Sequence, residues 1–418
     1  MTVPETQAPW AARDDLRITG VRAIVTAPEG VNLVVVRVDT NTAGLYGLGC
    51  ATFHQRFAAV VAAVDDHLAP LVAGRHPADI TDIARMLAFS GYWREGPVLN
   101  AALSGVDMAL WDIAGKRAGM PVHELLGGRV RTAAPVYLHA NGGTVEAAVE
   151  DAARYVAAGF RHVRLQAGQP GAGTYGAPAA PGGYPDAPHP GGWEVARYLT
   201  DTPALFARAR EVLGDDVHLL HDVHNRLTPA QAVVLARALE PYRLFFLEDV
   251  VAPEHYDRLP EVRAAAPVPI AAGELLGSVP EAARLVGGGA VDFLRLHLST
   301  VGGLTPARKL ADLCELSGVQ TAWHAPADQS PVGFAANVAL DVSSPAFGIQ
   351  EGHLYPDRVR EIFPGTPRVE AGYAWASDAP GWGVDLDERL AAAHPPVTGV
   401  FERWAARVRR PDGSLLTP

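Results

Sequence analysis

Chemically active side chains stand close together in the segment HDVHNRLTP, residues 221–229. Asp222 is followed two residues later by His224, directly after an apolar pair where a strand is expected to end. Two further carboxylates recur with a fixed period, since Glu248 lies 26 residues after Asp222 and Glu274 lies 26 residues after Glu248. This period suits one strand, one helix and two loops, so the three acids should take equivalent places in successive β/α units.

Three carboxylates side by side at one rim repel one another unless a cation lies between them. Oxygen ligands from separate strands, without thiolates or a histidine trio, favour Mg2+ over Zn2+. We therefore expect Asp222, Glu248 and Glu274 to be Mg2+ ligands. A zinc hydrolase is the weaker alternative, because the early strand VYLHA supplies only His139 as an imidazole ligand.

Other candidate groups stand at the ends of neighbouring apolar runs. Side chains two apart on a strand share a face, so His224 should point into the same mouth as Asp222 and act there as a proton donor. Arg164 should point inward on an earlier strand, and Tyr175 lies in the loop after it. A phenol beside a fixed guanidinium has its phenolate stabilised, which suits a general base. The remaining strand ends and loops add groups that suit a hydroxylated anion: Arg295, His324, Asp328 and Glu351.

The elements that must position these groups fall into two kinds. Residues 18–27, 32–40 and 44–53 predict three short strands, and helical patterns follow at 55–73, 78–89 and 98–118. Strands followed by helices predict an α+β domain.

From about residue 134 the pattern alternates between short apolar runs and helical segments. Eight such β/α units in a row predict a (β/α)8 barrel, an α/β fold, behind the α+β cap. We expect the cap at 1–133, the barrel with its metal site at 134–392, and a C-terminal segment, 393–418, that returns to the cap. The Gly- and Pro-rich stretch within 168–202 is either disordered or a lid over the barrel mouth.

Composition excludes several classes of protein. With 418 residues, 48% of them hydrophobic and 19% charged, the chain has the profile of a folded two-domain protein. A net charge of −11 argues against nucleic acid or an anionic membrane as partner. No apolar run is long enough to span a membrane, and the N-terminus does not read as a secretory signal. Only Cys50 and Cys314 occur, so a reduced, cytoplasmic protein is expected.

The motifs HDVHNRLTP, FLED, GEL, FLRLHLSTVGGLTPARKLADLCE, HAPADQSPVG and FGIQE follow one another in an order that resembles the mannonate dehydratase subgroup of the enolase superfamily. The segments LHANG (138–142) and RLQAGQPGAGTYG (164–176) are similar to that subgroup as well. The likeness runs from about residue 18 to 392.

This resemblance implies roles for the candidate residues. Asp222, Glu248 and Glu274 would hold Mg2+, Arg164 and Tyr175 would form the general-base pair, and His224 would be the general acid. The implied substrate contacts are His139, Arg295, His324, Asp328 and Glu351. The implied reaction removes the proton next to the carboxylate of a sugar acid of the D-mannonate or D-gluconate type, and expels the 3-hydroxyl as water. The product is a 2-keto-3-deoxy sugar acid, and a homo-oligomer is expected because barrels of this superfamily usually associate.

The chain also departs from the subgroup in the residues expected near the substrate. His54, a candidate substrate contact in the cap, stands where the family usually has asparagine. GELLGS replaces the common GEVFN, Pro326 occupies a position where proline goes with weaker activity, and the end, DGSLLTP, lacks a tryptophan. These departures favour one alternative: a metal-binding homologue with little turnover that acts as a sugar-acid or lactone binding protein.

Overall fold

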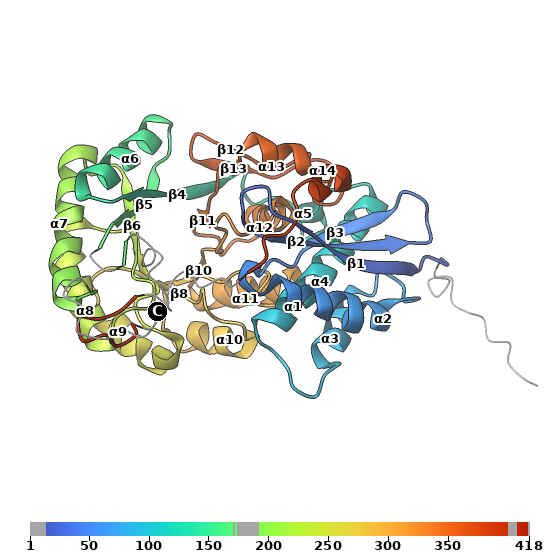
Figure 1. Cartoon of the computed structure of the whole chain (residues 1–418), viewed down its shortest axis with the longest axis horizontal. Helices are drawn as coiled ribbons and strands as arrows, with labels where there is room; N and C mark the ends of the chain where they lie inside the picture. The colour runs from blue at the N-terminus through green and yellow to red at the C-terminus, as the bar shows by residue number, and fades with distance from the viewer. Residues whose placement is uncertain (1–13, 170–171, 174–191, 400–407, 417–418) are drawn as a thin grey trace, which may run out of the picture.

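The computed structural model describes residues 14–169, 172–173, 192–399 and 408–416. Figure 1 shows two lobes, with the N-terminal lobe on the right and a larger lobe of alternating strands and helices on the left. The N-terminal lobe contains β1 (Ile18–Thr26), β2 (Leu33–Thr40), β3 (Tyr46–Cys50), α1 (Phe57–Ala62), a π-helical turn (Ala63–Leu68), α2 (Ala69–Val72), α3 (Ile80–Phe89), α4 (Pro97–Ala118) and α5 (Val122–Leu125).

The three predicted cap strands form an antiparallel sheet in the order β1-β2-β3, and α4 packs across it. Close packing depends on two glycines of β3, because a Cβ at Gly47 would overlap the carbonyl oxygen of Ala109 and one at Gly49 would overlap that of Gly105. The sheet and helix enclose a core of their own that includes Val36, and the predicted α+β cap is confirmed.

The larger lobe repeats a strand and a helix eight times, as the sequence predicts. The strands are β4 (Ala134–Gly142), β5 (His162–Ala167), β6 (His218–Asp222), β7 (Phe246–Glu248), β8 (Ile270–Ala272), β9 (Phe293–Leu294), β10 (Gln320–Thr321) and β11 (Gln350–Glu351). The helices after them are α6 (Val145–Ala157), α7 (Val195–Leu213), α8 (Pro229–Leu239), α9 (Leu259–Ala265), α10 (Val279–Gly287), α11 (Leu304–Ser317), α12 (Pro331–Ser343) and α13 (Asp357–Ile362).

Strand pairing carries the eight strands around a ring. Strands β4 to β10 pair in parallel in chain order, and β11 pairs in parallel with β4. A single bridge from Thr321 in β10 to Phe347, just before β11, links the last two strands. The chain is therefore a (β/α)8 barrel with an N-terminal cap, and the carboxyl ends of all eight strands face one mouth.

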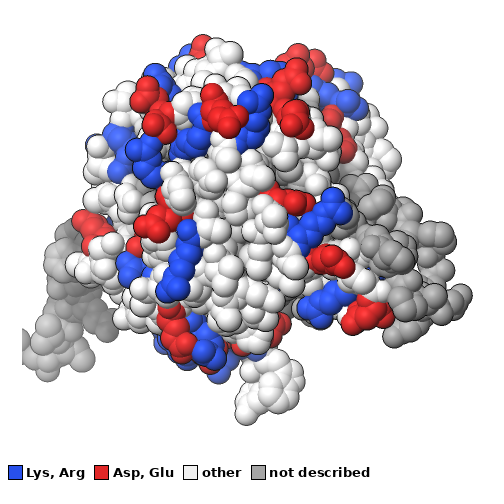
Figure 2. Space-filling model, turned by 90° about the vertical axis from the view of Figure 1, so that its left-hand side faces the viewer, with Lys and Arg blue, Asp and Glu red and all other residues white. Residues whose placement is uncertain are grey.

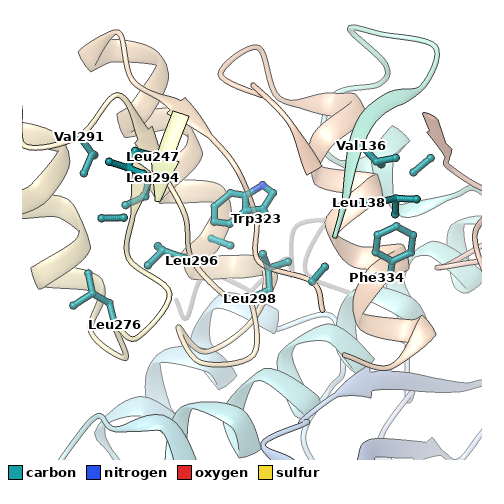
Figure 3. Packing of buried hydrophobic residues seen from close by; sticks show 14 of the residues in the cluster. Val136, Leu138, Leu247, Leu276, Val291, Leu294, Leu296, Leu298, Trp323 and Phe334 are labelled. Atoms are coloured by element: carbon teal, nitrogen blue, oxygen red, sulfur yellow. The ribbon is translucent and has the colours of Figure 1, made fainter. Parts of the chain in front are cut away.

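Alternation along the strands sorts apolar from polar side chains. In FLRLHL, Leu294, Leu296 and Leu298 are buried in the core around the barrel, whereas Arg295 and His297 alternate with them. Figure 3 shows the three leucines in succession, with Trp323 close to them. Burying each leucine contributes about 1.5–3 kcal/mol, and the same register turns Arg295 towards the barrel axis.

Inside the barrel, successive strands contribute a small apolar layer beneath the mouth. Its members are Tyr137, Leu220, Phe246, Ala271, Phe293, Ala322 and Ile349. The rings of Phe246 and Phe293 lie 5.1 Å apart, and Tyr137 packs edge-on to Phe246. This layer is the floor on which the polar groups of the mouth rest.

After the barrel the chain forms elements that the sequence did not predict. A hairpin of β12 (Arg368–Glu370) and β13 (Tyr373–Trp375) pairs antiparallel with the start of β4, and the short α14 (Glu388–Ala392) lies against β1. Residues 394–397 then bond to the cap, because Val397 and Asn32 exchange two hydrogen bonds. Residues 408–416 instead lie on the barrel, where Trp193 N–H donates to the Arg409 carbonyl at 2.7 Å. The boundaries at 133 and 392 stay a prediction.

Surface charge and helix length limit what the chain can contact. On the face shown in Figure 2, acidic and basic side chains are interspersed, and neither sign forms a continuous patch. None of the helices in the described ranges combines the length and the apolar composition that crossing a bilayer requires.

A pair of stacked histidines at the start of the barrel strands makes folding sensitive to acid. The rings of His162 and His218 lie 4.4 Å apart, and Phe245 packs edge-on to His162 at 5.0 Å. Burial, together with His218, lowers the pKa of His162 to about 3. The unfolded chain binds this proton near pH 6.5, so stability from the neutral ring is present above that pH and is lost as pH falls towards 3.

We expect His162→Phe to reduce the loss of unfolding free energy between pH 7 and pH 5 by about 2 kcal/mol, at roughly 1.4 kcal/mol for each pH unit below 6.5. Urea denaturation at both pH values measures this loss. Between pH 9 and pH 7 the variant and the parent should respond alike. An unchanged acid sensitivity in the variant would contradict the assignment.

Candidate active site

A cavity of about 870 Å3 lies between the cap and the mouth of the barrel. The cap contributes Phe53 and a short 3-10 turn, His54–Arg56, that follows β3. Nine of the predicted site residues line the cavity: His54, His139, Arg164, Asp222, His224, Glu274, His324, Asp328 and Glu351. Glu248 and Arg295 lie beneath it with fully buried side chains. Tyr175 lies outside the described residues.

The three recurring acids stand on neighbouring strands, as their period predicts. Asp222 and Glu248 end β6 and β7 and are direct partners in the parallel register. Glu274 follows the end of β8 by two residues. Asp222 and Glu248 are buried, and the Glu274 side chain is 22% exposed at the cavity wall.

Two arginines cross-link these acids. Nη1 of Arg164 lies 2.9 Å from Asp222 Oδ2 and 2.6 Å from Glu248 Oε1. Arg295 reaches the other side, with Nε 3.1 Å from Glu248 Oε2 and Nη1 2.6 Å from Glu274 Oε2. Because arginine nitrogens contact these carboxylate oxygens, no three acidic or imidazole side chains in the described ranges are spaced as ready-made metal ligands.

Negative charge nevertheless exceeds positive charge at this site. Five carboxylates meet here: Asp222, Glu248, Asp249, Glu274 and Glu351. The cations in contact with them include Arg164, Arg295 and the imidazole of His324. Burial opposes the charge on His324, but Glu351 and Glu274 raise its pKa to about 9. Five acids against these three cations leave an excess of two negative charges, which is the charge of one divalent ion.

The pKa values reflect the same excess. Burial raises the pKa of Glu248 to about 8, although Arg295 and Arg164 oppose this. Burial likewise raises the pKa of Asp249 to about 7. Asp222 differs, because His224 and Arg164 overcome its burial and hold its pKa well below the usual range. An oxygen donor set of this charge fits Mg2+, since a divalent cation would replace the protons that Glu248 and Asp249 otherwise take up.

His224 reaches the cavity by a turn of the backbone. The sequence argument assumed that the strand continues through His224, but the residue has φ +52° and Asn225 has φ +59°. The His224 N–H donates to Asp222 Oδ1 at 2.7 Å, and its Nε2 lies 2.9 Å from Asp222 Oδ2. Side chains that hold a non-glycine residue in the left-handed region are a feature of functional sites. The imidazole is thus fixed beside the first of the three acids.

Glu351 anchors the opposite wall of the cavity. Its Oε1 lies 2.6 Å from Nε2 of His139, and its Oε2 lies 2.9 Å from Nδ1 of His324. Burial and the nearby Arg164 lower the pKa of His139 to about 4, so this ring is neutral at pH 7. A neutral imidazole and a charged one therefore stand on either side of one carboxylate.

One contact spans the two lobes across the mouth of the cavity. Nε2 of His54, from the cap, lies 3.7 Å from Asp328 Oδ2, from the loop after β10. Pro326 lines the cavity in the same loop. The residues that depart from the family pattern are therefore placed at the opening, away from the acids on the floor.

The sequence argument missed several groups at the site. The hydroxyl of Tyr137 donates to Glu248 Oε2 at 3.2 Å from inside the barrel floor. Asp249 adopts φ +48° and contacts Arg295, although strand alternation would turn it outward. Arg226 lines the cavity, and so does Leu416, which the chain brings back from its far end.

The sequence predicts Arg295 as a substrate contact, whereas the structure buries it. Its guanidinium contacts Glu248, Asp249, Glu274 and Glu351, and its Nε donates to Tyr137 Oη at 3.2 Å. It therefore holds the acids from below instead of lining the cavity.

Two family models match the chain. Residues 147–390 match the enolase C-terminal domain-like family, and residues 13–127 match the mandelate racemase / muconate lactonizing enzyme N-terminal domain. The two matches correspond to the barrel and the cap.

Curated relatives match over nearly the whole length. A D-galactonate dehydratase family member from Catenulispora acidiphila is 67% identical over 100% of this chain and 97% of the relative. The D-galactonate dehydratase family member RspA from Pantoea ananatis is 48% identical over 97% of this chain and 100% of the relative. These names do not mention mannonate, so the mannonate dehydratase subgroup stays a prediction.

Among solved structures, an enolase from Pantoea ananatis with bound D-gluconate and Mg superposes with a TM-score of 0.90. It is 46% identical and covers 96% of this chain and 100% of its own. A mandelate racemase/muconate lactonizing enzyme from Jannaschia sp. CCS1 is 31% identical, with a TM-score of 0.78 over 92% of this chain and 98% of its own.

Proposed function

The chain belongs to the enolase superfamily, and from that premise we propose that it is a Mg2+-dependent dehydratase of sugar acids. The observation that carries the proposal is the trio Asp222, Glu248 and Glu274 on consecutive strands, with an excess of negative charge around it. The names of the relatives and the D-gluconate and Mg in the Pantoea structure support it. We propose substrates of the D-gluconate, D-mannonate or D-galactonate type.

The proposed reaction begins with loss of the proton on C2, next to the carboxylate. Asp222, Glu248 and Glu274 would hold Mg2+, which supplies positive charge to the substrate carboxylate as negative charge builds up on it. We assign the base to the pair of Arg164 and Tyr175, the latter on the ground of its sequence motif alone. A guanidinium held by Asp222 and Glu248 has a fixed position from which it stabilises a phenolate.

The second half of the reaction breaks the bond between C3 and its hydroxyl. His224 would donate a proton to this oxygen, so that it leaves as water while the C2–C3 double bond forms. The resulting enol takes up a proton at C3 and becomes the 2-keto-3-deoxy acid. Asp222, which contacts both the Nε2 and the backbone N–H of His224, would keep this ring in place.

Binding of the hydroxylated chain falls to the upper wall of the cavity. His139, His324 and Glu351 form a connected donor and acceptor surface there. His54 and Asp328 would contact the far end of the substrate from the cap side. Since buried polar groups left unpaired discriminate strongly between substrates, we assign the choice of sugar acid to this end.

A panel of acid sugars tests the proposal. We expect Mg2+-loaded protein to convert at least one of D-gluconate, D-mannonate and D-galactonate to a 2-keto-3-deoxy acid, detected with semicarbazide. Chelator should abolish turnover and added Mg2+ should restore it. Product formation that survives complete removal of divalent metal would count against the metal's role, and no product from any aldonate would count against the reaction.

A second candidate function is binding without useful turnover. It is favoured by the His54–Asp328 contact and Pro326, because both lie at the cavity opening where the family pattern changes. Calorimetry separates the two functions: a sugar acid or its lactone that binds tightly without forming product would support a binding or regulatory protein.

A further inference from the structure

The loop between α3 and α4, residues 90–96, carries aromatic side chains that the fold leaves in solvent. Tyr92 is 88% exposed and Trp93 is 83% exposed. Their rings pack edge to face with centroids 5.0 Å apart, so they form one apolar knob. The loop is the lowest part of the cap in Figure 1, and an uncharged projection stands at the lower edge of Figure 2. Adjacent aromatic side chains with this exposure are typical of an interaction site.

An apolar hollow of about 260 Å3 lies near the other end of α3. Its walls include Leu16 at the entry to β1, Pro77 and Ala78 just before α3, and Ile113 and Ala114 on α4. Helix α3 thus connects a hollow near its N-terminus to the knob that follows its C-terminus. The ten residues of α3 separate the two features by roughly 15 Å along the helix.

The outer face of α3 carries opposite charges between knob and hollow. Asp82 and Arg85 are both exposed and lie one helical turn apart. Two copies of α3 packed antiparallel about a twofold axis would bring Asp82 of each copy opposite Arg85 of the other. The same operation would bring each knob to the hollow of the other copy. Shape and charge are therefore self-complementary along this one face.

We propose that the chain forms a twofold-symmetric dimer through this cap face, consisting of α3, the Tyr92–Trp93 knob and the hollow beside Pro77. The partner is a second copy because one chain carries both members of each complementary pair. The proposal is independent of the reaction, since none of these side chains lines the active-site cavity.

The interface also touches the active site indirectly. The loop that carries the knob ends at Gly96, and Asn100, one turn into α4, donates hydrogen bonds to the carbonyls of Gly277 and Thr300. Gly277 lies three residues after the proposed ligand Glu274. Dimerisation would therefore fix the base of a loop that supports the metal site.

Sedimentation equilibrium of the full chain tests the proposal first. The parent protein should have the mass of two chains at micromolar concentration. Tyr92→Ser combined with Trp93→Ser should weaken the dimer by about 100-fold or more, because paired aromatic anchors dominate such interfaces. Leu316→Ser is the matched control, because Leu316 is 86% exposed at the far end of α11, away from this face. It should leave the dimer unchanged.

A charge exchange tests the proposed register. Asp82→Arg alone and Arg85→Asp alone should each weaken the dimer, and the double exchange should restore it. Restoration would also rule out misfolding of the single variants. A monomeric parent protein, or a dimer that survives loss of the knob, would overturn the proposal. Failure of the double exchange to restore the dimer would overturn the antiparallel pairing of α3.

Discussion

Asp222→Asn should abolish Mg2+ binding and lower kcat/KM for the preferred sugar acid by about 10^3-fold or more. The variant removes one carboxylate of the proposed metal trio, and losing several kcal/mol of charge stabilisation costs roughly one decade of rate per 1.4 kcal/mol. It also removes the oxygens that contact Arg164 and His224, so base and acid lose a shared neighbour. Calorimetric titration with Mg2+ and semicarbazide detection of the keto acid measure the two effects.

Asp341→Asn is the matched control for this variant. Asp341 is a fully buried aspartate on α12, and burial raises its pKa well above the usual range, so the neutral amide resembles its native state. It does not line the cavity. We expect the control to retain Mg2+ binding and turnover. Unchanged Mg2+ affinity in Asp222→Asn would remove the central support of the proposed function.

His224→Gln should lower kcat for dehydration by about 10^2–10^4-fold, the range expected for loss of a general acid. Gln retains a hydrogen-bonding group near Asp222 but cannot transfer the proton to the leaving hydroxyl. Because the proposed base lies on the other side of the substrate, removal of the C2 proton should continue. Proton NMR in D2O should therefore show exchange at C2 in the variant while formation of the 2-keto acid is nearly lost.

The contrast between exchange and dehydration decides the role of His224. If exchange and dehydration fall together, the ring positions the substrate or supports the metal and is not the acid. If neither falls, another group supplies the proton. Mg2+ affinity should stay close to that of the parent, which separates this variant from Asp222→Asn.

The sequence predicted the barrel and its acids because both follow from period. A strand, a helix and two loops occupy about 26 residues, and three carboxylates that repeat at this spacing must share a rim. The cap was predictable because its strands and helices have clear apolar patterns and glycine or proline boundaries. The registers of β6, β7 and β8 follow directly from this regularity.

Features that depend on irregular backbone were not predictable. His224, Asn225 and Asp249 adopt left-handed conformations, and strand alternation says nothing of such residues. Alternation placed Arg295 inside the barrel correctly, but its contacts with four carboxylates beneath the cavity depend on side-chain packing from distant strands. The β12–β13 hairpin was missed because its strands have three residues each, too few to show a period.

The C-terminal residues 408–416 lie at the mouth of the barrel, with Val408 and Leu416 each 2% exposed and both lining the active-site cavity. Gly192 lets this backbone pass closely, since a Cβ there would overlap Pro411 and its neighbours. Recombinant designs follow from this placement: an affinity tag or fusion partner joined after Pro418 would sit beside the substrate entrance, so such appendages belong at the other terminus.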